Sequence, residues 1–221
     1  MNIKTVQDVM TRQVVTVTPA SSWKDAVRLV ERARVHALPV VEDGRVVGIV
    51  AESDLLLKEE MLAGPLTLRA MPRQRRRDKM RARATTVRQM MSSPAVTIEP
   101  EALLGTAARL LHKRHIGRLP VLDARGELVG IVTRSDLLRV FLREDAEILD
   151  EVHQVLAALA PKIGTDITSA VDDGVVTLGG GVERLSMALA AVGAVRRIGG
   201  VVAIEDRTLA QFDDVNIVMV P

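Results

Sequence analysis

One of two similar short segments of the chain carries side chains that suit the binding of an anion. Thr133 and Arg134 offer a hydroxyl donor and a fixed positive charge, and both groups bind phosphate well. An otherwise similar segment has Ala51 and Glu52 in their place, so it lacks the hydroxyl and carries a negative charge. The segments are GIVTRSD at 130–136 and, 82 positions earlier, GIVAESD at 48–54.

The two segments close two copies of a longer repeat, at 6–56 and 87–138. VQDVMTRQVVTVTP aligns with VRQMMSSPAVTIEP, and RVHALPVV aligns with HIGRLPVL, both at an offset of 81. One extra residue in the second copy, DARGE against EDGR, moves the offset to 82. A repeated sequence of this length indicates two copies of one structural unit.

Each copy predicts the order strand, helix, strand, strand, helix. A short β-branched strand, at 14–17 or 95–98, ends before a proline. Apolar residues at positions i, i+3, i+4 and i+7 then indicate one buried helix face. Two strands follow, joined as a hairpin at Gly44 or Gly126, and Ser-Asp opens the last helix. The first stripe consists of Trp23, Ala26, Val27 and Val30.

Both copies resemble CBS domains, and the pair resembles a Bateman module. The resemblance is carried by VMT or MMS at the start, by the LPV strand, and by G-I-V-x-x-S-D before the last helix. It implies an α/β (α+β) fold and a non-enzymatic regulatory protein, in which a bound ligand shifts the balance between two arrangements of the repeats. We assign 1–60 to the first repeat, 61–86 to a basic connector and 87–145 to the second repeat.

The resemblance also implies a ligand, an adenosine nucleotide (AMP, ADP or ATP, with S-adenosylmethionine as another option) bound in a cleft between the repeats. Asp136 would accept hydrogen bonds from the ribose hydroxyls, Thr133 would donate to the phosphate, and Arg134 would neutralise it. Asp54 marks the equivalent site, which we expect to be empty, weak or selective for an uncharged adenosine group. The adenine would lie against Thr97, Ile98, Arg118 and Pro120.

A simpler interpretation of the same residues stays open. Ser-Asp before Leu-Leu is a common helix start, so Thr-Arg-Ser-Asp could be a cap alone.

Composition argues against catalysis. Cysteine is absent, which excludes disulfides, thiolate nucleophiles and cysteine-based zinc sites. The four histidines are scattered, so we expect neither a metal nor an enzyme activity. The N-terminus lacks the apolar region of a secretory signal, and the longest nearly apolar stretch, at 185–195, falls short of the ~20 residues that span a bilayer. We therefore expect a cytoplasmic protein.

The net positive charge of the chain comes from one segment, 69–88. It holds nine of the 30 lysines and arginines but one of the 28 acids, which leaves the remainder at a net charge of −6. Such a segment could bind nucleic acid or an anionic membrane without any nucleotide sensing. It has no aromatic residue to stack bases, and a solvated linker is favoured, with docking on an acidic surface of its own dimer as one option. Its arginines could instead reach the distal phosphates of a bound nucleotide.

Residues 146–221 match neither repeat. The pattern predicts a helix that ends at Pro161, a turn at 172–174, a second helix from about 183 to 195, and a closing strand at 201–206. DDGVVTLGGGV and IGGVVAIED resemble a BON domain, which implies a small α/β fold and a phospholipid-binding role. From residue 146 onward, 11 acids outnumber five bases, so an anionic membrane would repel this domain. We expect it to contact an unknown protein partner, and the CBS pair to form a homodimer.

Overall fold

The structure, a computed structural model, describes residues 4–62, 81, 83–164 and 166–215. Its contacts divide the chain into two compact units. The first is Met10–Thr133, here called the repeat unit. The second combines Met1–Val9 with Arg134–Pro221 and is called the C-terminal unit. Most of the predicted connector, 61–86, lies outside the described residues.

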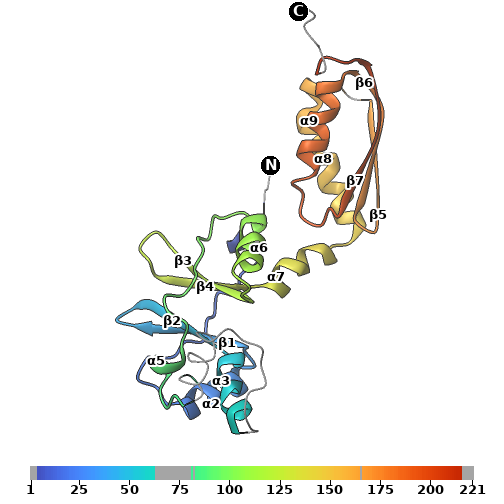
Figure 1. The fold of residues 1–221 in the computed structure, drawn as a ribbon. Helices are drawn as coiled ribbons and strands as arrows, with labels where there is room; N and C mark the ends of the chain where they lie inside the picture. The colour runs from blue at the N-terminus through green and yellow to red at the C-terminus, as the bar shows by residue number, and fades with distance from the viewer. Residues whose placement is uncertain (1–3, 63–80, 82, 165, 216–221) are drawn as a thin grey trace, which may run out of the picture. The chain divides into compact units, whose positions relative to one another are not determined.

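The repeat unit contains two antiparallel hairpins with helices before and after them (Figure 1). This arrangement confirms the predicted hairpins and the predicted helices on either side. The first copy consists of α2 (Trp23–Ala33), β1 (Ala37–Glu42), β2 (Arg45–Ala51) and α3 (Glu52–Leu62). The second consists of α5 (Val87–Met90), α6 (Leu104–Lys113), β3 (Arg118–Leu122) and β4 (Leu128–Thr133). Its closing helix, α7 (Arg134–Arg139), belongs to the C-terminal unit.

Local chemistry explains where these elements begin and turn. Ser22 caps α2, because its hydroxyl oxygen accepts the Asp25 N–H at 3.1 Å. The same hydroxyl donates to the Asp25 carboxylate at 2.7 Å and holds the pKa of that carboxyl below its usual value. Asp43 and Gly44 have φ of 51° and 77°, the positive angles that a two-residue hairpin turn requires.

The predicted leading strands at 14–17 and 95–98 are wrong as strands, because each makes only one parallel bridge. Val17 bridges Val40, with its N–H donating to the Pro39 carbonyl at 3.1 Å. To continue in either direction along the strands, a parallel ladder would need a backbone N–H at position 39 or at position 19, and both positions are proline. Proline has no N–H, so the ladder stops after one residue. Pro120 and Pro100 limit the bridge between Ile98 and Val121 in the same way.

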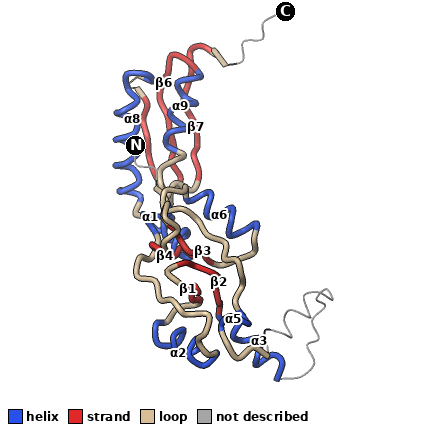
Figure 2. Tube along the Cα trace, turned by 90° about the vertical axis from the view of Figure 1, so that its left-hand side faces the viewer, coloured by secondary structure: helices blue, strands red, loops and turns tan. Residues whose placement is uncertain are grey.

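The C-terminal unit contains a three-stranded sheet with two helices along one face (Figures 1 and 2). β5 and β6 form an antiparallel hairpin, and β6 and β7 are parallel, joined through α9. The core lies between helices and sheet, with Val152, Val176, Leu178 and Ala191 fully buried. The elements are α1 (Val6–Val9), α7, η1 (Val140–Leu142), α8 (Asp145–Ile163), β5 (Ile167–Asp172), β6 (Val175–Arg184), α9 (Leu185–Val195) and β7 (Ala203–Phe212).

Two boundaries in this unit differ from the prediction. α8 does not end at Pro161 but continues to Ile163, because a proline in the last turn removes only one helical hydrogen bond. β7 extends beyond the predicted end at 206 to Phe212, since it pairs with β6 along its whole length. The turn at 172–174 is confirmed. None of the described helices is long and apolar enough to cross a bilayer.

Candidate functional site

The two repeats exchange their leading segments within the repeat unit. Ser92, from the start of the second copy, exchanges both backbone hydrogen bonds with Ile49 of the first, at 2.8 and 3.0 Å. Thr11, from the start of the first copy, pairs in the same way with Ile131 of the second, both bonds at 3.0 Å. The exchange places the leading segment of one copy beside the closing strand of the other. It explains why a site marked by Asp54 contains residues from both copies.

The glycine of each GIV segment permits this exchange. A Cβ on Gly48 would lie 2.7 Å from the Met91 sulfur and 2.9 Å from the Ser92 carbonyl oxygen. A Cβ on Gly130 would lie 2.4 Å from the Met10 sulfur. Met10 can move its flexible side chain, whereas the Ser92 backbone is held by its bonds to Ile49. Gly48 is therefore the less replaceable of the two.

We expect Gly48→Ala to destabilise the repeat unit by about 2 kcal/mol, because the added methyl group must displace the Ser92 backbone. Urea unfolding measures this as a lower midpoint. Gly105→Ala is the matched control, because a Cβ there meets nothing within 4 Å and alanine favours the interior of α6. Equal midpoints for the two variants would contradict the steric explanation.

The exchange forms a cavity of about 510 Å³ in the repeat unit. Its volume is within the range of small-molecule sites. Asp54 and Glu52 stand at the start of α3, Arg118 begins β3, and the segment 92–96 contributes Ser92, Pro94, Ala95 and Val96. His36, Ile49, Ala51, Ser53, Leu56, His115, Ile116 and Gly117 complete the lining. We call this the Asp54 cleft.

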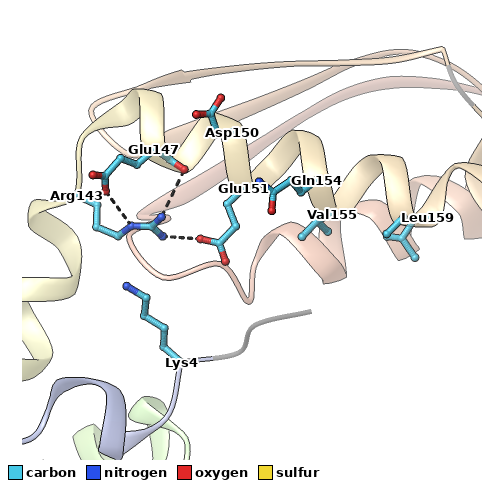
Figure 3. A pocket seen from close by; sticks show the side chains of 9 residues that line it. Lys4, Arg143, Glu147, Asp150, Glu151, Gln154, Val155 and Leu159 are labelled. Atoms are coloured by element: carbon cyan, nitrogen blue, oxygen red, sulfur yellow. Dashed lines mark hydrogen bonds and ion pairs between the residues drawn. The ribbon is translucent and has the colours of Figure 1, made fainter.

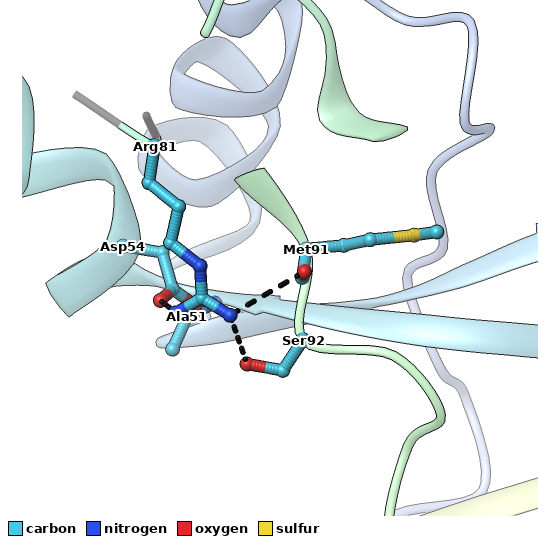
Figure 4. Close-up of polar contacts among 5 residues, drawn as sticks. All are labelled: Ala51, Asp54, Arg81, Met91 and Ser92. Atoms are coloured by element: carbon cyan, nitrogen blue, oxygen red, sulfur yellow. Dashed lines mark hydrogen bonds and ion pairs between the residues drawn. The ribbon is translucent and has the colours of Figure 1, made fainter. Parts of the chain in front are cut away.

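Asp54 lies in the cleft with only 12% of its side chain exposed. One carboxylate oxygen accepts the Ala51 N–H at 2.9 Å and so caps α3. The other accepts a guanidinium N–H of Arg81 at 3.0 Å (Figure 4). Arg81 also donates to the Ser92 hydroxyl at 3.1 Å and approaches the Met91 carbonyl at 3.5 Å. The carboxylate therefore serves as helix cap and ion-pair partner together.

Two further contacts involve polar side chains of the cleft. Glu52, the residue expected to repel phosphate, lies 2.8 Å from His36 Nδ1. Arg118 donates from its guanidinium to the His36 backbone carbonyl. Four cationic or ionisable side chains, Arg81, Arg118, His36 and His115, thus accompany the two carboxylates. The local sequence Ala51-Glu52 alone does not represent the charge of this site.

The residues predicted for the second-copy site fall into two groups. In the repeat unit, Ile98 is buried and its N–H donates to the Pro120 carbonyl at 3.1 Å, while Thr97 precedes it. Thr133 ends β4 opposite Arg118, whose side chain lines the Asp54 cleft. Arg134 and Asp136 belong to the C-terminal unit and occupy the first turn of α7.

Asp136 is 7% exposed and is the one buried charged residue among the described residues. It lies 3.5 Å from Arg139, one turn further along α7. Burial of a carboxylate is costly unless donors reach it. Its role as an acceptor of ligand hydroxyls stays a prediction.

A second cavity, of about 630 Å³, lies along α8 in the C-terminal unit (Figure 3). Arg143 is 16% exposed and pairs with Glu151 at 2.8 Å and Glu147 at 3.6 Å, while it also donates to the Gly199 carbonyl. These contacts join the start of α8 to the loop before β7. With Asp150, acids outnumber the bases Arg143 and Lys4 in this lining, so it does not favour an anionic headgroup.

Most of the lining of the Asp54 cleft is not among the residues predicted from the sequence, and Arg81, Ser92 and His36 are the polar residues with the closest contacts. Nothing in the local sequence distinguishes Arg81 from the other connector arginines. Ser92 belongs by sequence to the leading segment of the second copy. The one available signal was the expectation that a connector arginine could reach a cleft, which did not identify the residue.

Comparison with known proteins identifies the repeat. The CBS domain family model matches residues 6–59 and 87–143. The uncharacterized protein MJ1426 of Methanocaldococcus jannaschii is 32% identical over 156 residues, which covers 63% of this chain and 92% of the relative. The CBS domain-containing protein YhcV of Bacillus subtilis is 33% identical over 135 residues, 61% of this chain and 84% of YhcV.

A solved structure agrees with these matches. CBSX2, a CBS-pair protein of Arabidopsis thaliana, has been crystallised in complex with AMP. In that complex it is 31% identical, with a TM-score of 0.55, and the match covers 62% of this chain and 96% of CBSX2. The chain therefore belongs to the CBS-domain family, with two CBS domains in tandem as a Bateman module.

Proposed function

We propose that the CBS pair binds an adenosine nucleotide and that the chain is a regulatory protein that senses it. The observation that carries this proposal is the Asp54 cleft. It is a cavity of about 510 Å³ lined by a carboxylate, Asp54, that is only 12% exposed. Two neighbouring ribose hydroxyls could donate to the two oxygens of this carboxylate, beside or in place of its bonds to Ala51 and Arg81. A relative at 31% identity, CBSX2, has been crystallised with AMP, which supports the same class of ligand.

The second-copy site is the stronger candidate for a phosphate-bearing ligand. Asp136 would accept the ribose hydroxyls, Thr133 would donate to the phosphate and Arg134 would neutralise it. Thr97, Ile98, Arg118 and Pro120 would contact the adenine. AMP, ADP and ATP are the proposed ligands, with S-adenosylmethionine as the alternative. Binding would favour one arrangement of the repeats by no more than the difference in affinity between the two arrangements.

The rest of the chain would transmit this signal. We propose that the C-terminal unit is a BON-like module that contacts a protein partner, which its helix–strand–strand–helix–strand order supports. We also propose a homodimer. Three apolar side chains near α7 are unusually exposed and suit a contact with a second copy: Leu138 at 65%, Phe141 at 52% and Leu142 at 79%. A single-chain mass in light scattering at micromolar concentration would contradict the dimer.

Titration calorimetry with AMP, ADP, ATP and S-adenosylmethionine tests the sensing role. We expect saturable heat with at least one of the four ligands. Guanosine monophosphate is the control, because its base presents a different edge to the same cleft. Absence of heat with all four adenosine ligands would refute the proposal.

A further inference from the structure

Arg81 contacts the Asp54 cleft although it lies outside both repeats. Its guanidinium reaches the Asp54 carboxylate at 3.0 Å and the Ser92 hydroxyl at 3.1 Å (Figure 4). Its side chain is 25% exposed, and that of Asp54 is 12% exposed. An ion pair so far removed from water is stronger than one at the surface.

The chain on the C-terminal side of Arg81 is anchored to the first repeat. The Ala84 N–H donates to the Arg81 carbonyl at 2.9 Å, which ties the two residues in one turn. Ala84 is 2% exposed, and its carbonyl accepts Lys58 Nζ at 3.0 Å. The Thr85 carbonyl accepts the backbone N–H of Trp23 at 2.9 Å. Arg81 is thus brought to Asp54 by a packed segment and not by its own side chain alone.

A ligand that uses Asp54 must compete with Arg81. One carboxylate oxygen already caps α3 through Ala51, and the other receives the guanidinium. Ribose hydroxyls that bind this carboxylate share it with Arg81 and weaken the ion pair. A neutral nucleoside offers the partly shielded guanidinium no new counter-charge in return. A ligand with a phosphate supplies a new partner within reach of the flexible arginine.

We propose that Arg81 determines charge selectivity at the Asp54 cleft, disfavouring neutral nucleosides and favouring ligands that carry phosphate. This inference rests on the proposed function. It reverses the expectation drawn from Ala51 and Glu52, because Arg81 brings the positive charge that those two positions lack. Glu52 remains an opposing charge beside the same cleft, 2.8 Å from His36 Nδ1.

Binding at the Asp54 cleft and at the predicted Asp136 site can be followed separately, because the chain contains no cysteine and a single introduced thiol can be labelled uniquely. Leu56 lines the Asp54 cleft and is 63% exposed, so a fluorophore on Leu56→Cys reports on that cleft. Leu138, two residues after Asp136 as Leu56 is after Asp54, is 65% exposed and provides the second reporter. AMP and adenosine are titrated into each labelled protein.

We expect the Leu56 reporter to show that AMP binds at least about tenfold more tightly than adenosine. Arg81→Gln should reduce this preference by about tenfold, which is the loss expected for one charge-assisted contact. Arg81→Lys keeps the charge and should keep most of the preference. Arg83→Gln is the matched control, because it removes the same charge from an exposed residue two positions away. If Arg81→Gln lowers the thermal midpoint, Arg81→Met replaces it as a neutral variant that keeps the aliphatic stem.

An unchanged AMP-to-adenosine ratio in Arg81→Gln would overturn the inference, as would an equal change in Arg83→Gln. The inference would also be overturned if the Leu56 reporter detected binding of neither AMP nor adenosine. If the Leu138 reporter still responds to AMP, the sensing role survives that result. If neither reporter responds and calorimetry records no heat, the proposed function fails as well.

Discussion

Asp136→Ala is expected to weaken the binding of AMP by about 10- to 100-fold, since a charged acceptor of ribose hydroxyls is lost. Asp136 is 7% exposed, so water cannot readily replace it as the hydrogen-bond acceptor. Titration calorimetry measures the change directly. The effect should be similar for AMP and adenosine, because both ligands present the same ribose hydroxyls.

A purely structural role for Asp136 makes a different prediction. Asparagine also caps helices, so Asp136→Asn should preserve the start of α7 while it removes the charge. If Asp136 only caps, Asp136→Ala lowers the thermal midpoint, Asp136→Asn does not, and both variants bind AMP as the unmodified protein does. If Asp136 binds ribose, Asp136→Asn loses affinity although its midpoint is retained. An Asp136→Ala protein with unaltered AMP affinity would disprove the ribose role.

Local sequence signals were sufficient for most elements of the fold. The stripe from Trp23 to Val30 predicts α2, and Asp43-Gly44 predicts the first hairpin, because helix faces and tight turns depend on neighbouring residues. The leading strand at 14–17 was overestimated for a reason that is visible only with its partner. Pro39 sits where a ladder needs a donor, and sequence alone does not show which strand pairs with Val17.

The candidate site depends on contacts between distant residues, which periodicity cannot supply. Arg81 and Asp54 are 27 positions apart, and the packing of the following segment on Trp23 and Lys58 determines that they meet. Ser92 reaches the cleft because the leading segment of each repeat pairs with the closing strand of the other repeat. The two copies are similar, so the sequence does not show with which closing strand a leading segment pairs. The repeated motif identified both acidic positions, Asp54 and Asp136, because a helix start is a local feature.

The triple glycine of the C-terminal unit leads to the largest expected effect on stability. A Cβ on Gly180 would lie 1.9 Å from the Asp166 carbonyl oxygen, and the residue has φ of 96°. Both the overlap with backbone and the positive φ oppose any side chain. We expect Gly180→Ala to destabilise the C-terminal unit by about 3 to 5 kcal/mol. Differential scanning calorimetry should show its transition lowered by more than about 10 °C.

Gly181→Ala, one residue further along β6, separates this contact from a general cost of losing glycine. A Cβ at Gly181 meets nothing within 4 Å, so we expect a change below about 1 kcal/mol. Gly180 pairs with Ile167 in the β5–β6 ladder, and the residue before Ile167 supplies the obstructing carbonyl. The two glycines differ in this approach of the chain at the start of β5 and in backbone conformation, since Gly180 has a positive φ and Gly181 does not. Similar midpoints for the two variants would mean that Asp166 can move aside, and that the register of this hairpin is less constrained than its geometry indicates.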